Sequence, residues 1–182
     1  LCDRFIPPCT FLDLDNPEEY FFHNKDIVGI VNGIYVPALG YILAHEFAHQ
    51  YLGHVDMPEQ LIEHEIAADK CAIEFIKPTF SGKAGRANQI GIVSALCSIA
   101  LLDRELDGGT AHPNILSRLE NALSSFTLSN NDEIWGYAAV ALVIWHQYYY
   151  KTNLEMPRSV ESYFELFDKT RNAIKKKFEV ST

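Results

Sequence analysis

Apolar residues recur every three to four positions along most of the chain, a spacing that predicts a mainly helical protein. Six stretches carry this pattern, and polar, Gly or Pro residues separate them. We expect helices over 38–53, 57–76, 87–106, 114–126, 133–150 and 157–178. Gly53 is typical of the residue just beyond a helix end, and Asp56 with Pro58 is typical of a helix start. A short turn should therefore join the first two helices.

The stretch ahead of the first helix has the composition of strands. Residues 27–36 are rich in β-branched side chains, and Asn32-Gly33 within them is a strong signal for a two-residue hairpin turn. We therefore predict a small β-hairpin immediately before the first helix. The fold class is then mainly α, with this one α+β feature.

Length and composition fit one globular domain over residues 1–182. Hydrophobic residues make up 48% of the chain and charged residues 21%, which excludes disordered and fibrous classes. The net charge of -9 argues against nucleic-acid binding, which needs clustered Lys and Arg. No run reaches the roughly 18 to 20 apolar residues of a membrane span, so we expect no transmembrane segment.

The four cysteines indicate the redox setting. Cys2, Cys9, Cys71 and Cys97 show no C-x-x-C spacing, and the last two lie within apolar helical patterns. This favours a reduced, cytoplasmic protein, with a Cys2–Cys9 disulfide as the open alternative. The chain begins at Leu1 without Met and shows no signal-peptide pattern, so it is read as a domain that could be excised from a longer protein.

Two histidines and a glutamate interrupt the apolar pattern of the first helix. His45 and His49 are four residues apart, which places both on one helical face and within reach of one ion. This is the H-E-x-x-H arrangement of zinc sites. Glu46 follows the first histidine, where it can act as a general base beside the metal instead of binding it.

The second helix supplies a matching pair of acidic residues. Glu65 and Asp69 are four residues apart and share a face. A turn after His49 can bring Glu65 back as the third ligand, and Asp69 can then accept the outer N–H of a ligating histidine. Alternatives stay open, namely a pair of core histidines without metal, or a third ligand from His54 or His64. The register of His54 does not match the metzincin pattern, and His64 points about 100° away from Glu65.

The combined motifs resemble known peptidase families. H-E-F-A-H followed by E-I-A-A-D resembles the gluzincin metallopeptidases. His112 to Arg118 resembles the H-P-x-x-x-x-R segment of the family that includes the CaaX prenyl protease, HtpX and their soluble relatives, which we rank first. Glu65 to Pro78 also resembles the ImmA/IrrE regulatory proteases. The H-E-x-x-H motif and small helical character are similar to the Lit-type phage-exclusion peptidases.

This resemblance implies a zincin-like helical domain in which His45, His49 and Glu65 bind Zn²⁺ and Glu46 is the catalytic base. It also implies roles for three further residues, which lie outside the ligand set. Asp69 would orient a ligand, His112 would stabilise the oxyanion, and Arg118 would support His112 or nearby carboxylates. The alternative for the last two is a helix start with Pro113 in its first turn and an exposed arginine.

We therefore predict a zinc metallopeptidase, an endopeptidase that acts on a protein or peptide substrate. Zinc peptidases often hold the substrate in extended form on a strand beside the metal helix, and the predicted hairpin could serve in this way or only cover the core. The alternative function is a metal-binding regulatory or toxin-like interaction module without peptidase activity. An aminopeptidase also remains open, because no residue pattern decides it.

Overall fold

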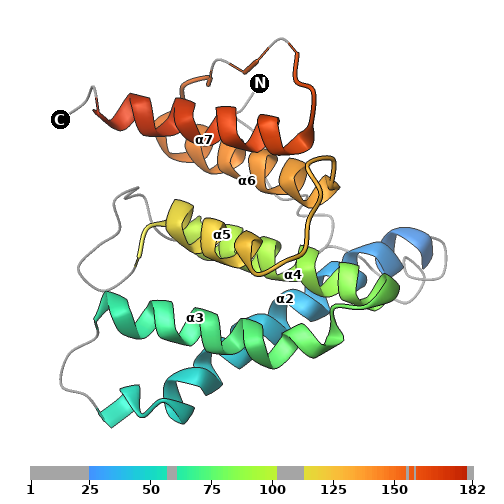
Figure 1. The fold of residues 1–182 in the computed structure, drawn as a ribbon, viewed down its shortest axis with the longest axis vertical. Coiled ribbons are helices and arrows are strands. Elements are labelled where there is room, and N and C mark those ends of the chain that lie inside the picture. The colour runs from blue at the N-terminus through green and yellow to red at the C-terminus, as the bar shows by residue number, and fades with distance from the viewer. Residues whose placement is uncertain (1–24, 57–60, 102–112, 155, 158, 180–182) are drawn as a thin grey trace, which may run out of the picture. The chain divides into compact units, whose positions relative to one another are not determined.

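The computed structural model describes residues 25–56, 61–101, 113–154, 156–157 and 159–179. All regular elements of these residues are helices, so the mainly helical class is confirmed (Figure 1). The longer ones are α2 (Lys25–Tyr51), α3 (Ile62–Ile76), α4 (Gly82–Ala100), α5 (Ile115–Ser124), α6 (Glu133–Tyr150) and α7 (Tyr163–Glu179). Two short 3₁₀ helices are η2 (His54–Asp56) and η3 (Lys77–Thr79).

The predicted β-hairpin is wrong. Residues 27–36 lie inside α2, and the Asn32-Gly33 pair continues the helix instead of turning the chain. β-branched residues cost a helix only a few tenths of a kcal/mol each, whereas an isolated two-stranded hairpin is at best marginally stable. A continuous helix also satisfies its backbone hydrogen bonds within one segment. The local turn signal was therefore outweighed by a long helix that even contains Pro37.

The chain divides into two compact units, Leu1–Gly33 and Ile34–Thr182. Within the second unit, α6 packs against α4 and α7, and α5 packs against α3 and α4. Large apolar side chains of these helices form its core, and the most deeply buried of them are Ile92, Leu96, Leu119, Leu123, Ile134, Leu142, Trp145 and Ile174. Arg171 of α7 donates to Glu120 of α5 at 2.7 Å, which ties these two helices at their surface. That residues 1–182 form one domain stays a prediction.

Close packing fixes α2 against α4. A Cβ atom added to Gly91 of α4 would lie 2.5 Å from the Cβ atom of Pro37 in α2, so only glycine permits the approach. Tyr41 follows Pro37 by about one turn and is fully buried in the core. The helical turn that carries His45 is therefore anchored on its inner side by packing that the glycine makes possible.

Of the described helices, α2 alone is long and apolar enough to cross a membrane by length and composition. Core helices of soluble proteins and leader segments have the same length and composition. The apolar length of α2 is continuous because residues 27–36 are helical and not the predicted strands. The absence of a transmembrane segment and the cytoplasmic location stay predictions.

Candidate metal centre

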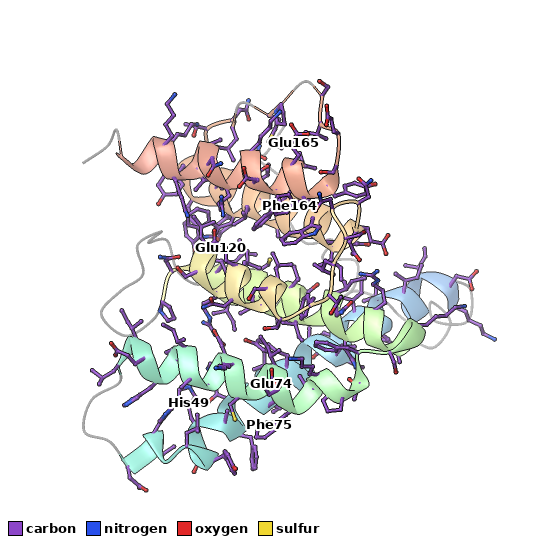
Figure 2. The ribbon with its side chains drawn as sticks, in the orientation of Figure 1. His49, Glu74, Phe75, Glu120, Phe164 and Glu165 are labelled. Carbon is purple, nitrogen blue, oxygen red and sulfur yellow. The ribbon has the colours of Figure 1, made fainter. Side chains whose placement is uncertain are left out.

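Helices α2 and α3 bring three potential metal ligands together. Nε2 of His45 lies 3.1 Å from Nε2 of His49. The two oxygens of Glu65 face these rings, with Oε2 at 3.4 Å from His45 Nε2 and Oε1 at 3.3 Å from His49 Nε2. Figure 2 shows His49 of α2 lying beside α3. The sequence prediction that a turn returns Glu65 to the two histidines agrees with this arrangement.

The separations suit a tetrahedral ion. Zinc binds nitrogen and oxygen donors at about 2.0–2.2 Å, and the edge of a tetrahedron is about 1.63 times its centre-to-corner distance, so donors lie about 3.3–3.6 Å apart. The His45–His49 distance of 3.1 Å is just below this range, and the distance from each ring to its nearer Glu65 oxygen, 3.4 or 3.3 Å, lies within it. With one donor atom taken from each residue, all three lie within 4.8 Å of one another. Two imidazoles and one carboxylate would hold the ion with three ligands and leave a fourth position for water or substrate. The residues present therefore fit a catalytic type of zinc site.

Asp69 contacts His45 on the side of its ring that faces away from Glu65 and His49. Its Oδ1 lies 2.9 Å from Nδ1 of His45, close enough for an ion pair. Arg118 of α5 donates to both oxygens of Asp69 at 2.7 Å, and the hydroxyl of Tyr41 donates to Oδ1 at 2.7 Å. His45, Asp69 and Arg118 are all buried. This network restricts the orientation of the His45 ring.

The three ligands open onto a cavity of about 450 Å³. Glu46 lines the same cavity, and its side chain is exposed. Arg118 reaches the cavity from α5 and Ile99 from α4. The cavity therefore places a carboxylate, a guanidinium group and apolar surface around the three donors, which is the composition of a site that could accept a peptide.

The family model described as Peptidase U49 matches residues 12–138 of the chain. The chain belongs to the peptidase U49 family. It is therefore a peptidase, and its proteolytic function rests on this membership. The matched residues include α2 through α5 and the beginning of α6, and with them His45, His49 and Glu65, which could hold a metal ion. Searches among curated proteins and among solved structures found no match.

Most predicted site residues of this peptidase U49 chain lie together. The structure gathers His45, Glu46, His49, Glu65 and Arg118 around one cavity, with Asp69 behind His45. Arg118 is buried and paired with a carboxylate, which differs from the alternative of an exposed arginine at a helix start.

Other predictions fall partly outside the described residues. His112, the candidate for oxyanion stabilisation, lies there, as do Cys2 and Cys9 with their alternative disulfide. Cys71 and Cys97 are free thiols in the described part of the chain, and both are half-buried.

His54 and His64, the two alternative third ligands, line the same cavity as the three donors. His54 Nδ1 lies 3.2 Å from Nδ1 of His49, and the His54 ring stacks on that of His64 with 4.3 Å between centroids. Burial, and then the charges of His64 and His49, lower the pKa of His54. Sequence reasoning missed this contact because it depends on how the chain turns after α2. The only available signal was a histidine directly after the helix-ending Gly53.

Charge at the centre depends on a buried histidine. Burial of His45 lowers its pKa, but the carboxylates of Asp69 and Glu65 together raise the pKa by more than burial lowers it. The pKa of His45 therefore lies at about 9. Burial raises the pKa of Asp69, yet the close contact with His45 and the hydrogen bonds from Arg118 bring this pKa below its usual value. In the metal-free protein His45 is therefore protonated at neutral pH, and its cation is held between two carboxylates.

We expect the metal-free protein to lose stability as the pH rises from about 6.5 to 9. The folded-state pKa of His45 is raised, so its stabilising contribution is complete below the unfolded value near 6.5 and is lost as the pH passes through about 9. The shift corresponds to about 3 kcal/mol at most. Urea unfolding with a chelator present measures this, and a His45→Gln variant should lack that part of the decline. An equal decline in both proteins would contradict the assignment to His45.

Proposed function

We propose that this peptidase U49 member is a zinc-dependent endopeptidase of the gluzincin type. The observation that carries the proposal is the set of 3.1–3.4 Å separations among donor atoms of His45, His49 and Glu65. A buried structural zinc site is normally closed by four protein ligands, whereas this cluster has three and faces a cavity. The donor set and the open position together support a hydrolytic role.

Each residue near the cluster has a proposed part in the reaction. When bound, zinc would supply a Lewis acid that polarises a carbonyl and acidifies water. The carboxylate of Glu46 takes a proton from the attacking water and delivers it to the nitrogen of the leaving amine. Asp69 keeps the imidazole of His45 turned with Nε2 toward the cavity. His112 remains the proposed donor to the oxyanion.

The proposed substrate is a protein or peptide, and no nucleic acid is involved. Because residues 27–36 are helical, the suggested substrate strand cannot come from a hairpin there. Binding in extended form stays a proposal without that element. Ile42 and Ile99 provide apolar surface in the cavity, so an apolar side chain beside the cleaved bond fits this wall better than a charged one. A likeness to the soluble relatives of the CaaX prenyl protease and HtpX, and a cytoplasmic location, belong to the same proposal.

Metal analysis tests the zinc site directly. Protein purified without a chelator should contain about one zinc ion per chain, because three protein ligands are the usual complement of a catalytic site. His45→Ala should lose most of this zinc, since it removes a ligand. His146→Gln is a matched control, because His146 is a buried histidine of α6 outside the donor cluster. Wild-type protein without zinc, or a His45→Ala variant with undiminished zinc, would refute the proposal.

The alternative of a metal-binding interaction module without peptidase activity is not favoured by any contact of the described residues. Membership of a peptidase family argues against it. So does Glu46, because a carboxylate beside an open metal position is useful to a hydrolase and has no role in a purely structural site. Activity after replacement of this residue separates the two functions.

A further inference from the structure

We propose that His54 is a positioning residue that holds the second metal ligand, His49, in its binding orientation. The inference deepens the proposed function and rests on it. His54 is in hydrogen-bonding distance of the one ring nitrogen of His49 that faces away from the cluster. It would act on His49 as Asp69 acts on His45, although it comes from a different element and has a different chemical character.

The geometry assigns the two nitrogens of His49 to different partners. Nε2 faces Nε2 of His45 and Oε1 of Glu65, so it is the nitrogen that would bind the ion. Nδ1 lies 3.2 Å from Nδ1 of His54. An imidazole that binds metal through Nε2 carries its proton on Nδ1, and ligating histidines almost always donate this N–H to an acceptor. His54 supplies that acceptor when its own proton is on Nε2.

Local structure holds His54 at this place. Helix α2 ends at Tyr51, and Gly53 adopts a φ of +73°, a left-handed conformation that glycine adopts without strain. This reverses the chain, so that η2 begins at His54 with its ring directed back to α2. On α3, His64 stacks against the His54 ring at an interplanar angle of 17°. His54 is therefore fixed from both helices that carry metal ligands.

The two ligand histidines are supported unequally. His45 has a buried carboxylate behind it, and that carboxylate is itself held by Arg118 and Tyr41. His49 has the imidazole ring of His54 next to its Nδ1, and His54 is only half-buried. An imidazole accepts a hydrogen bond without adding negative charge to the site. The orientation of His49 is therefore the part of the centre that depends on the turn after α2.

Two replacements separate the hydrogen bond from the ring contact. His54→Phe keeps an aromatic ring for stacking on His64 but removes the acceptor. His54→Asn removes the ring but keeps a carbonyl oxygen at nearly the position of Nδ1, because both atoms are bonded to Cγ. We expect His54→Phe to weaken zinc binding by about 10- to 100-fold, the usual cost of losing such a partner, and His54→Asn to stay within about threefold of wild type. Competition with a chromophoric chelator measures the dissociation constant of Zn²⁺ for each protein.

Thermal unfolding of the three metal-free proteins is the accompanying control, and their midpoints should agree within a few degrees. Unchanged zinc affinity in His54→Phe would overturn the role of His54 while leaving the proposed function intact. Equal weakening in both variants would also overturn it, because it would indicate that His54 binds the ion itself or acts through its ring. Absence of zinc binding by the wild type would instead refute the proposed function, and this inference with it.

Discussion

A Glu46→Gln variant should bind zinc as the wild type does and lose hydrolysis of its substrate by about two to four orders of magnitude. Glutamine has nearly the shape of glutamate, but its amide cannot take a proton from water. Glu46 lines the cavity without belonging to the donor cluster, so its replacement leaves all three ligands in place. New N-termini that arise in cells with the active protein, and not with the variant, would also identify the substrate.

The matched control for this experiment is Glu63→Gln. Glu63 lies near the start of α3, is exposed, and does not line the metal cavity. Its replacement makes the same change of charge and should leave zinc content and hydrolysis unchanged. Retained hydrolysis in Glu46→Gln would exclude Glu46 as the base. A loss of zinc together with activity would mean that the defect lies in metal binding instead of proton transfer.

Helix α6 shows what could be predicted from the sequence alone. Its expected range, 133–150, agrees with the structure. The side chain of Asp132 accepts a hydrogen bond from the backbone N–H of Ile134 at 3.1 Å, and Lys151 ends the helix in a left-handed conformation. Both boundaries are local, so a polar residue beside an apolar periodic run was sufficient to predict them.

The predicted hairpin is wrong because the Asn32-Gly33 turn signal is local, whereas the conformation there is set by the surrounding helix. Asn32-Gly33 is compatible with a turn, but the pair lies within 27 residues that form one helix. Helix formation is cooperative, so whether two residues are helical depends on the whole segment around them and not on the pair alone. The same error concealed the candidate membrane-spanning length of α2.

For the candidate site, residues on one helical face could be predicted, and contacts between elements could not. Four-residue spacing was sufficient to pair His45 with His49. It was not sufficient to predict that Tyr41 donates to Asp69, because that contact depends on how α2 and α3 cross. Likewise, the sequence did not decide whether Arg118 supports His112 or a nearby carboxylate. The position of α5 places Arg118 against the carboxylate of Asp69.

The ion pair behind the metal cluster should be the costliest one to break. Asp69→Leu removes the carboxylate to which Arg118 donates two hydrogen bonds, and Arg118 is buried. A buried charge that loses its partner costs about 3–5 kcal/mol of stability. We therefore expect urea unfolding of the metal-free protein to show a loss of this size. Zinc affinity should fall by about 10- to 100-fold as well, since His45 loses its support.

A double variant distinguishes the ion pair from general damage to the fold. Asp69→Leu with Arg118→Met removes both charges and should restore most of the stability, because apolar replacement of a buried pair is often nearly neutral. The hydroxyl of Tyr41 still lacks its acceptor, which leaves a deficit of about 1–3 kcal/mol. Zinc affinity should not recover, because the restored packing supplies no carboxylate to His45. The exposed pair of Glu74 and Lys77 is the control, since Glu74→Leu should cost less than about 1 kcal/mol. Equal instability of the single and double variants would show that Asp69 stabilises the fold by some means other than its pairing with Arg118.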